Sequence, residues 1–496
     1  MSVRRVITRM YRDLLGDCFL IRIEDDKQQW QHVLIDCGLL QGLENAGDRM
    51  IAIAENIAET CKGTLDLLVV THEHWDHISG FGQARDIFLN SDRLRIKQLW
   101  MAWTENPADA TAKGLREKFD DRKFAISNLA MALKASGDDD TERLLLGQLD
   151  NFIGPVDPPA SLGLAPTGRL TGARIMEELK KAAGATTYLE PGAVTVTPGE
   201  APLRVAVLGP PRNPARLFKD APSSGDAKET YLAEDFLEPS LLAADAGTGA
   251  DPAMGLETPF AWRYSQGLSV ADVTAAGAAD PGTDARWLHD HYVAPDDAGE
   301  GRPQDYRRID GEWAQNATNL ALKLDSDTNN TSLVLAFELP DGSFMLFAAD
   351  AQVGNWLSWH DQDYDLGPSL DAETILNRTR LYKVGHHGSH NATLRGRGLK
   401  MMTHPELVAL VSTIEAVALK QGRSPPGWQM PDQDVKAALM QHCAGRVVIG
   451  DRVWTPDPGF AAQPEFARAL DQSQPLFVEY TAYAAPRRRR AAKPKG

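Results

Sequence analysis

Cysteine and long apolar runs are both scarce in this chain of 496 residues, and each scarcity excludes a class of protein. The four cysteines, Cys18, Cys37, Cys61 and Cys443, form no CxxC pair, which argues against a disulfide framework and for a reducing compartment. No run approaches the roughly eighteen apolar residues that a transmembrane helix needs. The amino-terminal sequence MSVRRVITRMYRD also lacks the apolar core of a signal peptide. We therefore expect a cytoplasmic protein that does not use the membrane.

Net positive charge is missing as well. The formal charge is −16, which disfavours a broad, non-specific DNA-binding face. The exception is PRRRRAAKPKG at the carboxyl end, within a basic segment that we predict to be a disordered tail over residues 476–496. A solvated end and a contact with nucleic acid or an acidic partner both fit this composition.

Strand and helix patterns alternate along most of the chain, which is typical of the α/β class. Apolar strands are expected in VITRM, CFLIRI, WQHVLIDCG, LDLLVV, IKQLWMAW, AVTVTP and LRVAVLGPP, and helical spacing in RMIAIAENIAETC and ISGFGQARDIF. The hairpin TSLVLAFELPDGSFMLFAAD, with its turn at Asp341-Gly342, precedes the strands TRLYKV, LVALVST and RVVIG. We predict one domain over residues 1–475, interrupted by a helical insertion at about 105–188 and an acidic, loop-rich insertion at about 213–318.

The heptapeptide THEHWDH, residues 71–77, places three histidines and two acids directly after the apolar run LDLLVV. In an extended turn His72 and His74 point the same way, while Asp76 and His77 face a second point nearby. Two adjacent cations each need three or more nitrogen or oxygen ligands, and this spacing supplies half of each set. The alternative is one face of an amphipathic helix, but the β-rich lead-in and the glycines that follow favour a loop.

Two later segments end in further candidate ligands. Asp350 ends the run FMLFAAD, where a carboxylate is costly unless it is paired or bound to metal. It is the natural ligand for two cations to share, although it could also cap the next helix. The segment KVGHHGSHN supplies His386, His387 and His390, with glycines that allow the backbone a close approach. Buried structural histidines are the alternative interpretation.

These motifs together resemble the metallo-β-lactamase superfamily of metal-dependent hydrolases. More narrowly, LLGDCFLIRI, LIDCG, NNTSLVL, FAADAQ and LYKVGHHGSHNAT are similar to the hydrolase domain of ComEC-type DNA-uptake proteins and their soluble relatives. The resemblance covers roughly residues 1–105, 190–212 and 320–455, and leaves the two insertions outside. It implies a four-layer αββα sandwich with a two-metal site along one edge.

The resemblance also implies a role for each motif residue. The first metal would be held by His72 and His74, the second by Asp76, His77 and His387, and both by Asp350. His386 is a weaker match than His387, which directly precedes the glycine. Asp36 matches the acid that orients the ligand turn, and Asp17 and Asn330 match positions that line the cleft.

One departure from the superfamily concerns the first metal. A further histidine usually lies between the first motif and the bridging aspartate, but here only His289 and His291 do, inside the acidic insertion. Either that segment folds back over the site, or the first metal is held loosely, as in ComEC-type sequences that also lack this ligand. Loose binding favours exchange, so we expect two divalent cations, zinc or alternatively manganese.

Such a site suits hydrolysis by a metal-bound hydroxide, since paired cations lower the pKa of water and stabilise charge on the attacked group. We expect a phosphodiesterase or nuclease acting on an oligonucleotide or nucleotide, because phosphate engages both cations. Hydrolysis of a lactone, ester or thioester is the alternative, followed by a di-iron oxidoreductase and a non-enzymatic interaction protein. His390 and Ser389 are candidates to assist the leaving group, unless they only cap the next helix. Trp103 is either core or a substrate platform.

Overall fold

The computed structural model describes residues 1–40, 43, 45–136, 170–219, 273, 275, 283–292, 294, 323–364, 370–421 and 427–485. These residues form two mixed β-sheets and the helices around them. Most of the acidic insertion, the centre of the helical insertion and the last residues of the basic tail lie outside this description.

The first sheet has eight strands in the order β14-β15-β1-β2-β3-β4-β5-β6. In chain order these strands are β1 (Val3–Tyr11), β2 (Phe19–Asp25), β3 (Trp30–Ile35), β4 (Thr64–Val69), β5 (Arg95–Ala102), β6 (Thr186–Leu189), β14 (Leu470–Asp471) and β15 (Phe477–Ala484). Strands β3 to β6 are parallel, and the remaining pairs are antiparallel. Parallel strands end at the same edge of a sheet, so the segments after β3 and β4 meet there.

The second sheet has seven strands in the order β13-β12-β11-β10-β9-β8-β7. They are β7 (Val194–Val196), β8 (Arg204–Gly209), β9 (Val334–Glu338), β10 (Phe344–Phe347), β11 (Thr379–Lys383), β12 (Val408–Val411) and β13 (Val447–Ile449). Strands β9 and β10 form the expected antiparallel hairpin, and Gly342 in its turn has φ 81°. Strands β10 to β13 are parallel, which brings the segments after β10, β11 and β12 to one edge.

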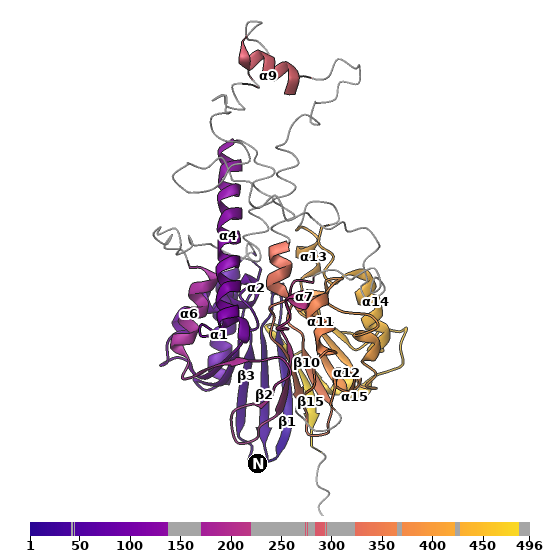
Figure 1. Cartoon of the computed structure of the whole chain (residues 1–496). Coiled ribbons are helices and arrows are strands. Elements are labelled where there is room, and N and C mark those ends of the chain that lie inside the picture. Colours follow the sequence, from indigo (N-terminus) through magenta and orange to yellow (C-terminus); the bar gives the residue numbers. More distant parts are fainter. Residues whose placement is uncertain are drawn as a thin grey trace, which may run out of the picture.

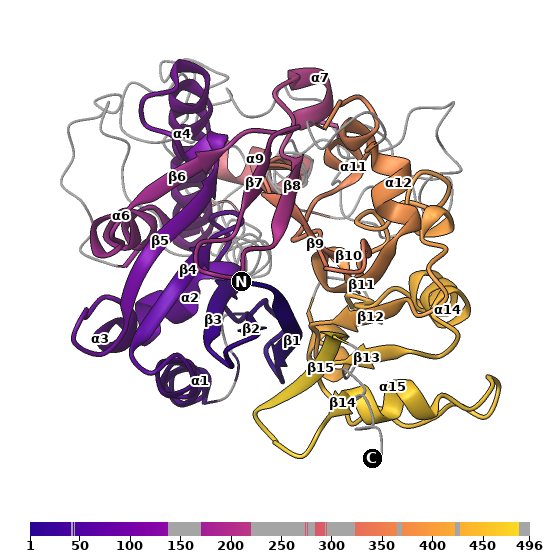
Figure 2. The same ribbon diagram turned by 90° about the horizontal axis from the view of Figure 1, so that it is seen from below.

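Apolar residues of both sheets form one shared core, so the sheets stack face to face. Two further apolar clusters lie on the outer faces. The first sheet is covered by α1 (Ala46–Thr60), α2 (Trp75–Gln83), α3 (Arg85–Phe88) and α6 (Gly172–Ala182), and the second by α11 (Val353–Trp359), α12 (Ala372–Asn377) and α14 (Gln433–His442). Figure 2 shows this arrangement of helices outside two inner sheets. The expected α/β layering is therefore present.

The helical insertion is helical in both of its described parts. Helix α4 (Ala110–Ser136) rises from the sandwich in Figure 1, and α6 packs against α2. The segment closes with strand β6, which the sequence analysis did not predict. Within the acidic insertion, the described residues include the helices α7 (Pro214–Leu217) and α9 (Asp284–Tyr292).

The predicted carboxyl-terminal boundary is wrong. Residues 477–484 are not part of a tail but form β15, which pairs with β1 along almost its whole length. The strand alternates buried and half-buried side chains, as expected for a strand with one face on the core. The predicted basic character of the tail therefore applies to residues 486–496, which lie outside the described residues.

No helix among the described residues combines the length and apolarity that crossing a bilayer requires.

Candidate metal centre

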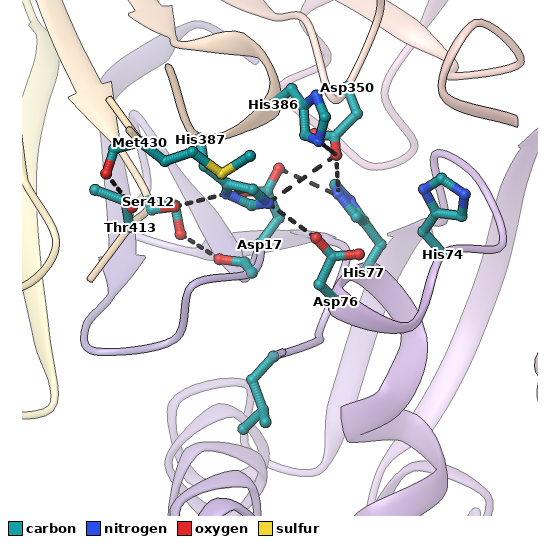
Figure 3. Close-up of polar contacts among 12 residues, drawn as sticks. Asp17, His74, Asp76, His77, Asp350, His386, His387, Ser412, Thr413 and Met430 are labelled. Atoms are coloured by element: carbon teal, nitrogen blue, oxygen red, sulfur yellow. Dashed lines mark hydrogen bonds and ion pairs between the residues drawn. The ribbon is translucent and has the colours of Figure 1, made fainter. Parts of the chain in front are cut away.

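Three strand ends bring the histidine and aspartate motifs to one edge of the sandwich. The segment after β4 carries His72, His74, Asp76 and His77. Asp350 follows β10, and the pair His386 and His387 follows β11. Figure 3 shows the side chains of Asp76, His77, Asp350 and His387 gathered around a common point.

The motif THEHWDH is part loop and part helix, which corrects the expected extended turn. His72 and His74 precede helix α2. His74 is the residue directly before the helix, and its backbone is extended. Asp76 and His77 lie inside the first turn of α2, and the His74 carbonyl accepts hydrogen bonds from the amides of His77 and Ile78 at 3.0 and 3.1 Å. An acidic side chain is favourable there because of the helix dipole.

The start of α2 is held by close backbone packing. The carbonyls of Asp76 and His77 accept hydrogen bonds from the amides of Asp17 (2.9 Å) and Cys37 (2.8 Å). A side chain at Gly38 would collide with the backbone of Asp76 and His77, so the glycine of LIDCG is required by this packing. The loops after β1 and β3 therefore fix where the two ligands of the helix point.

Asp76, His77, Asp350 and His387 form the second cation group, numbered after the metal that they are expected to hold, and all four are buried. The Nε2 atom of His387 lies 2.9 Å from Asp76 Oδ2, and the Nε2 atom of His77 lies 3.1 Å from Asp350 Oδ2. In each group, one ligand atom per residue lies within 4.8 Å of all the others. Two imidazoles and two carboxylates thus converge on a common point.

His72, His74 and Asp350 form the first cation group, also buried. The rings of His72 and His74 are 4.7 Å apart between centroids. Asp350 belongs to both groups, as expected for a shared ligand. The buried Nε2 of His72 and Oδ1 of Asp76 have no hydrogen-bond partner among the described residues, which is costly unless a cation satisfies them.

Hydrogen bonds behind the rings fix which nitrogen faces the cluster. The Nδ1 atom of His77 lies 2.8 Å from Asp36 Oδ2, and Asp36 also accepts hydrogen bonds from the amide (2.8 Å) and hydroxyl (2.7 Å) of Thr71. The Nδ1 atom of His387 donates to the Ser412 carbonyl at 2.6 Å, since a carbonyl only accepts. Both rings therefore present Nε2 to the cluster, the pattern seen where carboxylates and carbonyls orient metal-binding histidines. Asp36 lies where an orienting acid is expected.

The histidines of the two groups differ in their pKa. Burial lowers the pKa of His74 to about 4 and that of His72 well below its usual value, so both are neutral and able to bind metal. Burial also opposes protonation of His77 and His387, but the surrounding carboxylates outweigh it and raise the pKa of both rings. A cation at the second group would compete with these protons.

Asp17 lies beneath the cluster rather than along a cleft. Its side chain is buried, its carboxylate forms an ion pair with the ammonium of Lys383, and its Oδ1 lies 3.8 Å from His387 Nδ1. Lys383 is itself buried and lies 3.7 Å from Asp350 Oδ1. Asp17, Asp36 and His77 form a third group whose ligand atoms lie within 4.8 Å of one another. In this group the carboxylate of Asp17 is already paired with the ammonium of Lys383.

Asn330 also lies in the interior, although it was expected at the cleft. Its Oδ1 accepts hydrogen bonds from the amides of Gln352 (3.1 Å) and Asn355 (3.3 Å), and its Nδ2 donates to the Lys219 carbonyl at 2.9 Å. The amide therefore shapes the segment that follows Asp350.

His386 is close to the cluster but belongs to neither group. Its Nε2 lies 3.9 Å from Asp350 Oδ2, and burial lowers its pKa to about 4. The backbone of His386 and His387 is left-handed, with φ 41° and 53°, a strained conformation that tends to occur at functional sites. The two rings are 5.9 Å apart between centroids, with an angle of 62° between their planes.

The remaining candidates lie away from the two groups. Ser389 donates its hydroxyl hydrogen bond to Asn391 at 3.0 Å. His390 is half-buried, and its pKa is lowered by burial against the opposing charge of Asp432. Trp103 is fully buried and its indole donates to the Pro210 carbonyl at 2.9 Å, so it is a core residue and not a platform.

The two histidines of the acidic insertion do not complete the first metal site. His289 and His291 lie on α9, which stands apart from the sandwich in Figure 1. The Nδ1 atom of His289 lies 3.2 Å from Asp290 and that of His291 lies 2.7 Å from the Trp287 carbonyl. Of the two explanations for the missing ligand, folding back of this segment is wrong in this structure.

Sequence reasoning missed two charged residues of the centre, the buried Lys383 and the half-buried Asp325. Lys383 carried a usable signal, because a lysine inside the apolar strand LYKV needs a partner. Asp325 carried none, since it precedes the NNTSLVL motif in a polar stretch. Its Oδ1 lies 3.7 Å from His74 Nε2.

Comparison of the chain with models of protein families, with curated proteins and with solved structures gave no match. The class of site therefore rests on geometry: buried histidines and aspartates that could hold a metal ion, at the common edge of two mixed sheets.

Proposed function

We propose that the chain is a metal-dependent hydrolase of the metallo-β-lactamase fold, with two divalent cations and a phosphodiester substrate. The single observation that carries the proposal is that two groups of buried imidazoles and carboxylates share Asp350. A shared carboxylate between two otherwise separate donor sets is the arrangement of a dinuclear site. Surface acidic clusters lack such a set of buried, converging nitrogens.

The residues fit divalent cations by their chemistry. Each group offers imidazole nitrogen and carboxylate oxygen, the donors that zinc and manganese accept. Paired cations at such a site supply Lewis acidity, which favours ionisation of water and stabilises charge on a phosphate. The chain's own contribution is a rigid and buried frame, with Asp36 and Thr71 fixing His77 and the Ser412 carbonyl fixing His387.

Charge supports a phosphodiester over a neutral ester. Phosphate retains negative charge throughout hydrolysis, so it gains from two cations where an ester carbonyl needs one. The net charge of −16 makes a broad electrostatic surface for long duplex DNA unfavourable. We therefore propose a small or single-stranded substrate, such as a nucleotide or an oligonucleotide.

The test uses the purified chain, stripped of metal and reloaded with zinc or manganese. Hydrolysis of bis(p-nitrophenyl) phosphate and of p-nitrophenyl acetate is then compared, followed by a panel of DNA, RNA and cyclic nucleotides. We expect metal-dependent diester turnover that a chelator abolishes. Ester turnover without diester turnover would replace the phosphodiesterase with a carbonyl-centred hydrolase, and absence of bound metal would overturn both.

Matched variants separate the cluster from the rest of the chain. Asp350→Asn removes the ligand common to both groups, and we expect turnover to fall at least 1,000-fold, roughly the scale seen when an essential catalytic group is lost. The double variant His289→Ala, His291→Ala removes two histidines that lie outside the centre, and its turnover should be unchanged.

A further inference from the structure

The first cation group is incomplete as described so far. His72, His74 and Asp350 provide three donors, one of them shared with the neighbouring group, which has four. The histidines of α9 lie elsewhere. A fourth donor must therefore come from another part of the sandwich if both cations are to be held equally.

Asp325 lies at the position where that donor is missing. It belongs to a helical segment described over residues 323–329, between the acidic insertion and β9. Its Oδ1 lies 3.7 Å from His74 Nε2, and this oxygen is buried without a hydrogen-bond partner among the described residues. The other oxygen, Oδ2, accepts a hydrogen bond from Asn329 Nδ2 at 3.2 Å. One oxygen is thus held and the other is left facing the imidazole.

The neighbouring acid Asp327, on the same helix, differs from Asp325 because basic side chains pair with its carboxylate. Asp327 lies 2.6 Å from the ammonium of Lys323 and 3.5 Å from the guanidinium of Arg122. In the described part of the chain, no lysine or arginine is recorded within ion-pair distance of Asp325, and the nearby charges are the carboxylates of Asp76 and Asp350. A buried carboxylate among like charges is unfavourable unless a cation joins it.

We propose that Asp325 is the fourth ligand of the first cation, in the place where the resembling family has a histidine. Two ligand atoms that each lie about 2.0–2.2 Å from one zinc ion are at most about 4.4 Å apart, so the 3.7 Å between Asp325 Oδ1 and His74 Nε2 fits one shared ion. Asp325 lies outside the 4.8 Å group formed by His72, His74 and Asp350, so its carboxylate must move toward that group when the ion binds. The inference rests on the metal-binding part of the proposed function and not on the reaction.

The assignment gives the two sites the same donor set. The first then has His72, His74, Asp325 and Asp350, and the second has His77, His387, Asp76 and Asp350. Two imidazoles and two carboxylates per site form a harder set than three imidazoles, which shifts preference toward oxygen-seeking cations such as manganese. The two sites should therefore load with similar selectivity.

The experiment measures metal content after dialysis and titrates the metal-free chain with cobalt, whose visible absorption reports coordination. We expect two ions per wild-type chain and one in Asp325→Asn. The loss of first-site affinity should exceed the roughly 10- to 100-fold that removal of an outer hydrogen-bond partner causes. Asp325→His restores an imidazole donor and should restore two ions.

Asp327→Asn is the control, since it disturbs the same helix without touching the cluster. It should retain two ions, even if its melting temperature falls. Two ions bound with unchanged affinity in Asp325→Asn would overturn the inference, as would loss of one ion in Asp327→Asn. If the wild-type chain itself binds no metal, the proposed function fails instead, so the two failures are distinguishable.

Discussion

The carboxylate of Asp36 orients the ring of His77, although Asp36 itself belongs to neither cation group. It accepts hydrogen bonds from Thr71 and holds His77 Nδ1 at 2.8 Å, so the opposite nitrogen faces Asp350. An amide at this position could turn its NH₂ group toward His77 and reverse the tautomer of the ring. The orientation of one ligand thus depends on a single pair of oxygens.

We therefore expect Asp36→Asn to weaken metal binding about 10- to 100-fold while the fold remains. Titration of the metal-free variant with zinc or cobalt measures this change. Asp66→Asn is the matched control, because Asp66 also holds a backbone amide, that of His32 at 2.9 Å, but lies outside both cation groups. Equal metal affinity in Asp36→Asn and the wild-type chain would refute the orienting role.

A second prediction at this scale concerns His32, on β3. Burial lowers its pKa from 6.5 to about 4, against the opposing effect of Asp66. Between these two pH values the unfolded chain binds a proton that the folded chain does not, so stability falls as the pH drops from 6.5 toward 4. The shift corresponds to about 3 kcal/mol.

Replacing His32 with glutamine should remove the part of the pH dependence of stability that the titration of His32 causes. The free energy of unfolding of the wild-type chain should fall between neutral pH and pH 4. For His32→Gln we expect this fall to be smaller by about 3 kcal/mol. Urea unfolding of both metal-free proteins at a series of pH values measures the difference. Parallel curves for the two proteins would contradict it.

Among the elements, helix α4 is tied directly to the ligand turn. Lys123 of α4 is buried and forms an ion pair with Glu73, which stands between His72 and His74. The two partners come from the helical insertion and from the segment after β4. This salt bridge therefore connects the insertion to the segment that carries His72 and His74.

We expect Lys123→Met to lower the free energy of unfolding by about 3 kcal/mol, because the half-buried Glu73 is then left without its cation. Adding Glu73→Gln should recover much of that loss, since the stranded charge is gone. Chemical denaturation of the two single variants and the double variant forms the required cycle. Additive effects of the two substitutions would show that the pair is not coupled.

The sequence could predict most strands because their apolar runs are bounded by turns and charges, as in LDLLVV and RVVIG. The sequence analysis placed the start of α2 too late. It interpreted Asp76 only as a metal ligand and did not consider that an acidic side chain is favourable in the first turn of a helix. Strand β6 was missed because its residues, TTYL, include two threonines and form no apolar run. Strand β15 was missed because its partner β1 lies at the other end of the chain.

The candidate site was predictable where ligands sit in one motif. His72, His74, Asp76 and His77 are neighbours in sequence, and the strand-end positions of Asp350 and His387 bring them to the same edge. The place of Lys383 inside an apolar strand was a signal that the sequence reasoning did not use, whereas Asp325 owes its importance to a tertiary environment that no local pattern encodes. The inward positions of Asp17 and Asn330 were hidden for the same reason.

For the whole molecule, the pairing of β15 with β1 joins the two ends of the chain in one sheet. Truncation after Ala485 removes only residues outside this sheet, whereas truncation after Pro475 removes β15 and exposes the edge of β1. We expect the first product to be folded and soluble with an unchanged melting temperature, and the second to aggregate. Circular dichroism and size-exclusion chromatography distinguish these results, and a folded, monomeric second product would contradict the assigned role of β15.

The ligands are drawn from the chain in a fixed order during synthesis. His72 to His77 emerge from the ribosome early, Asp350 more than two hundred residues later, and His387 and Ser412 later still. A partly translated protein therefore carries an open half-site of imidazoles that could trap the wrong ion. In the proposed metal centre both sites are complete only after His387 has been synthesised, so we expect the nearly finished polypeptide to acquire the metal.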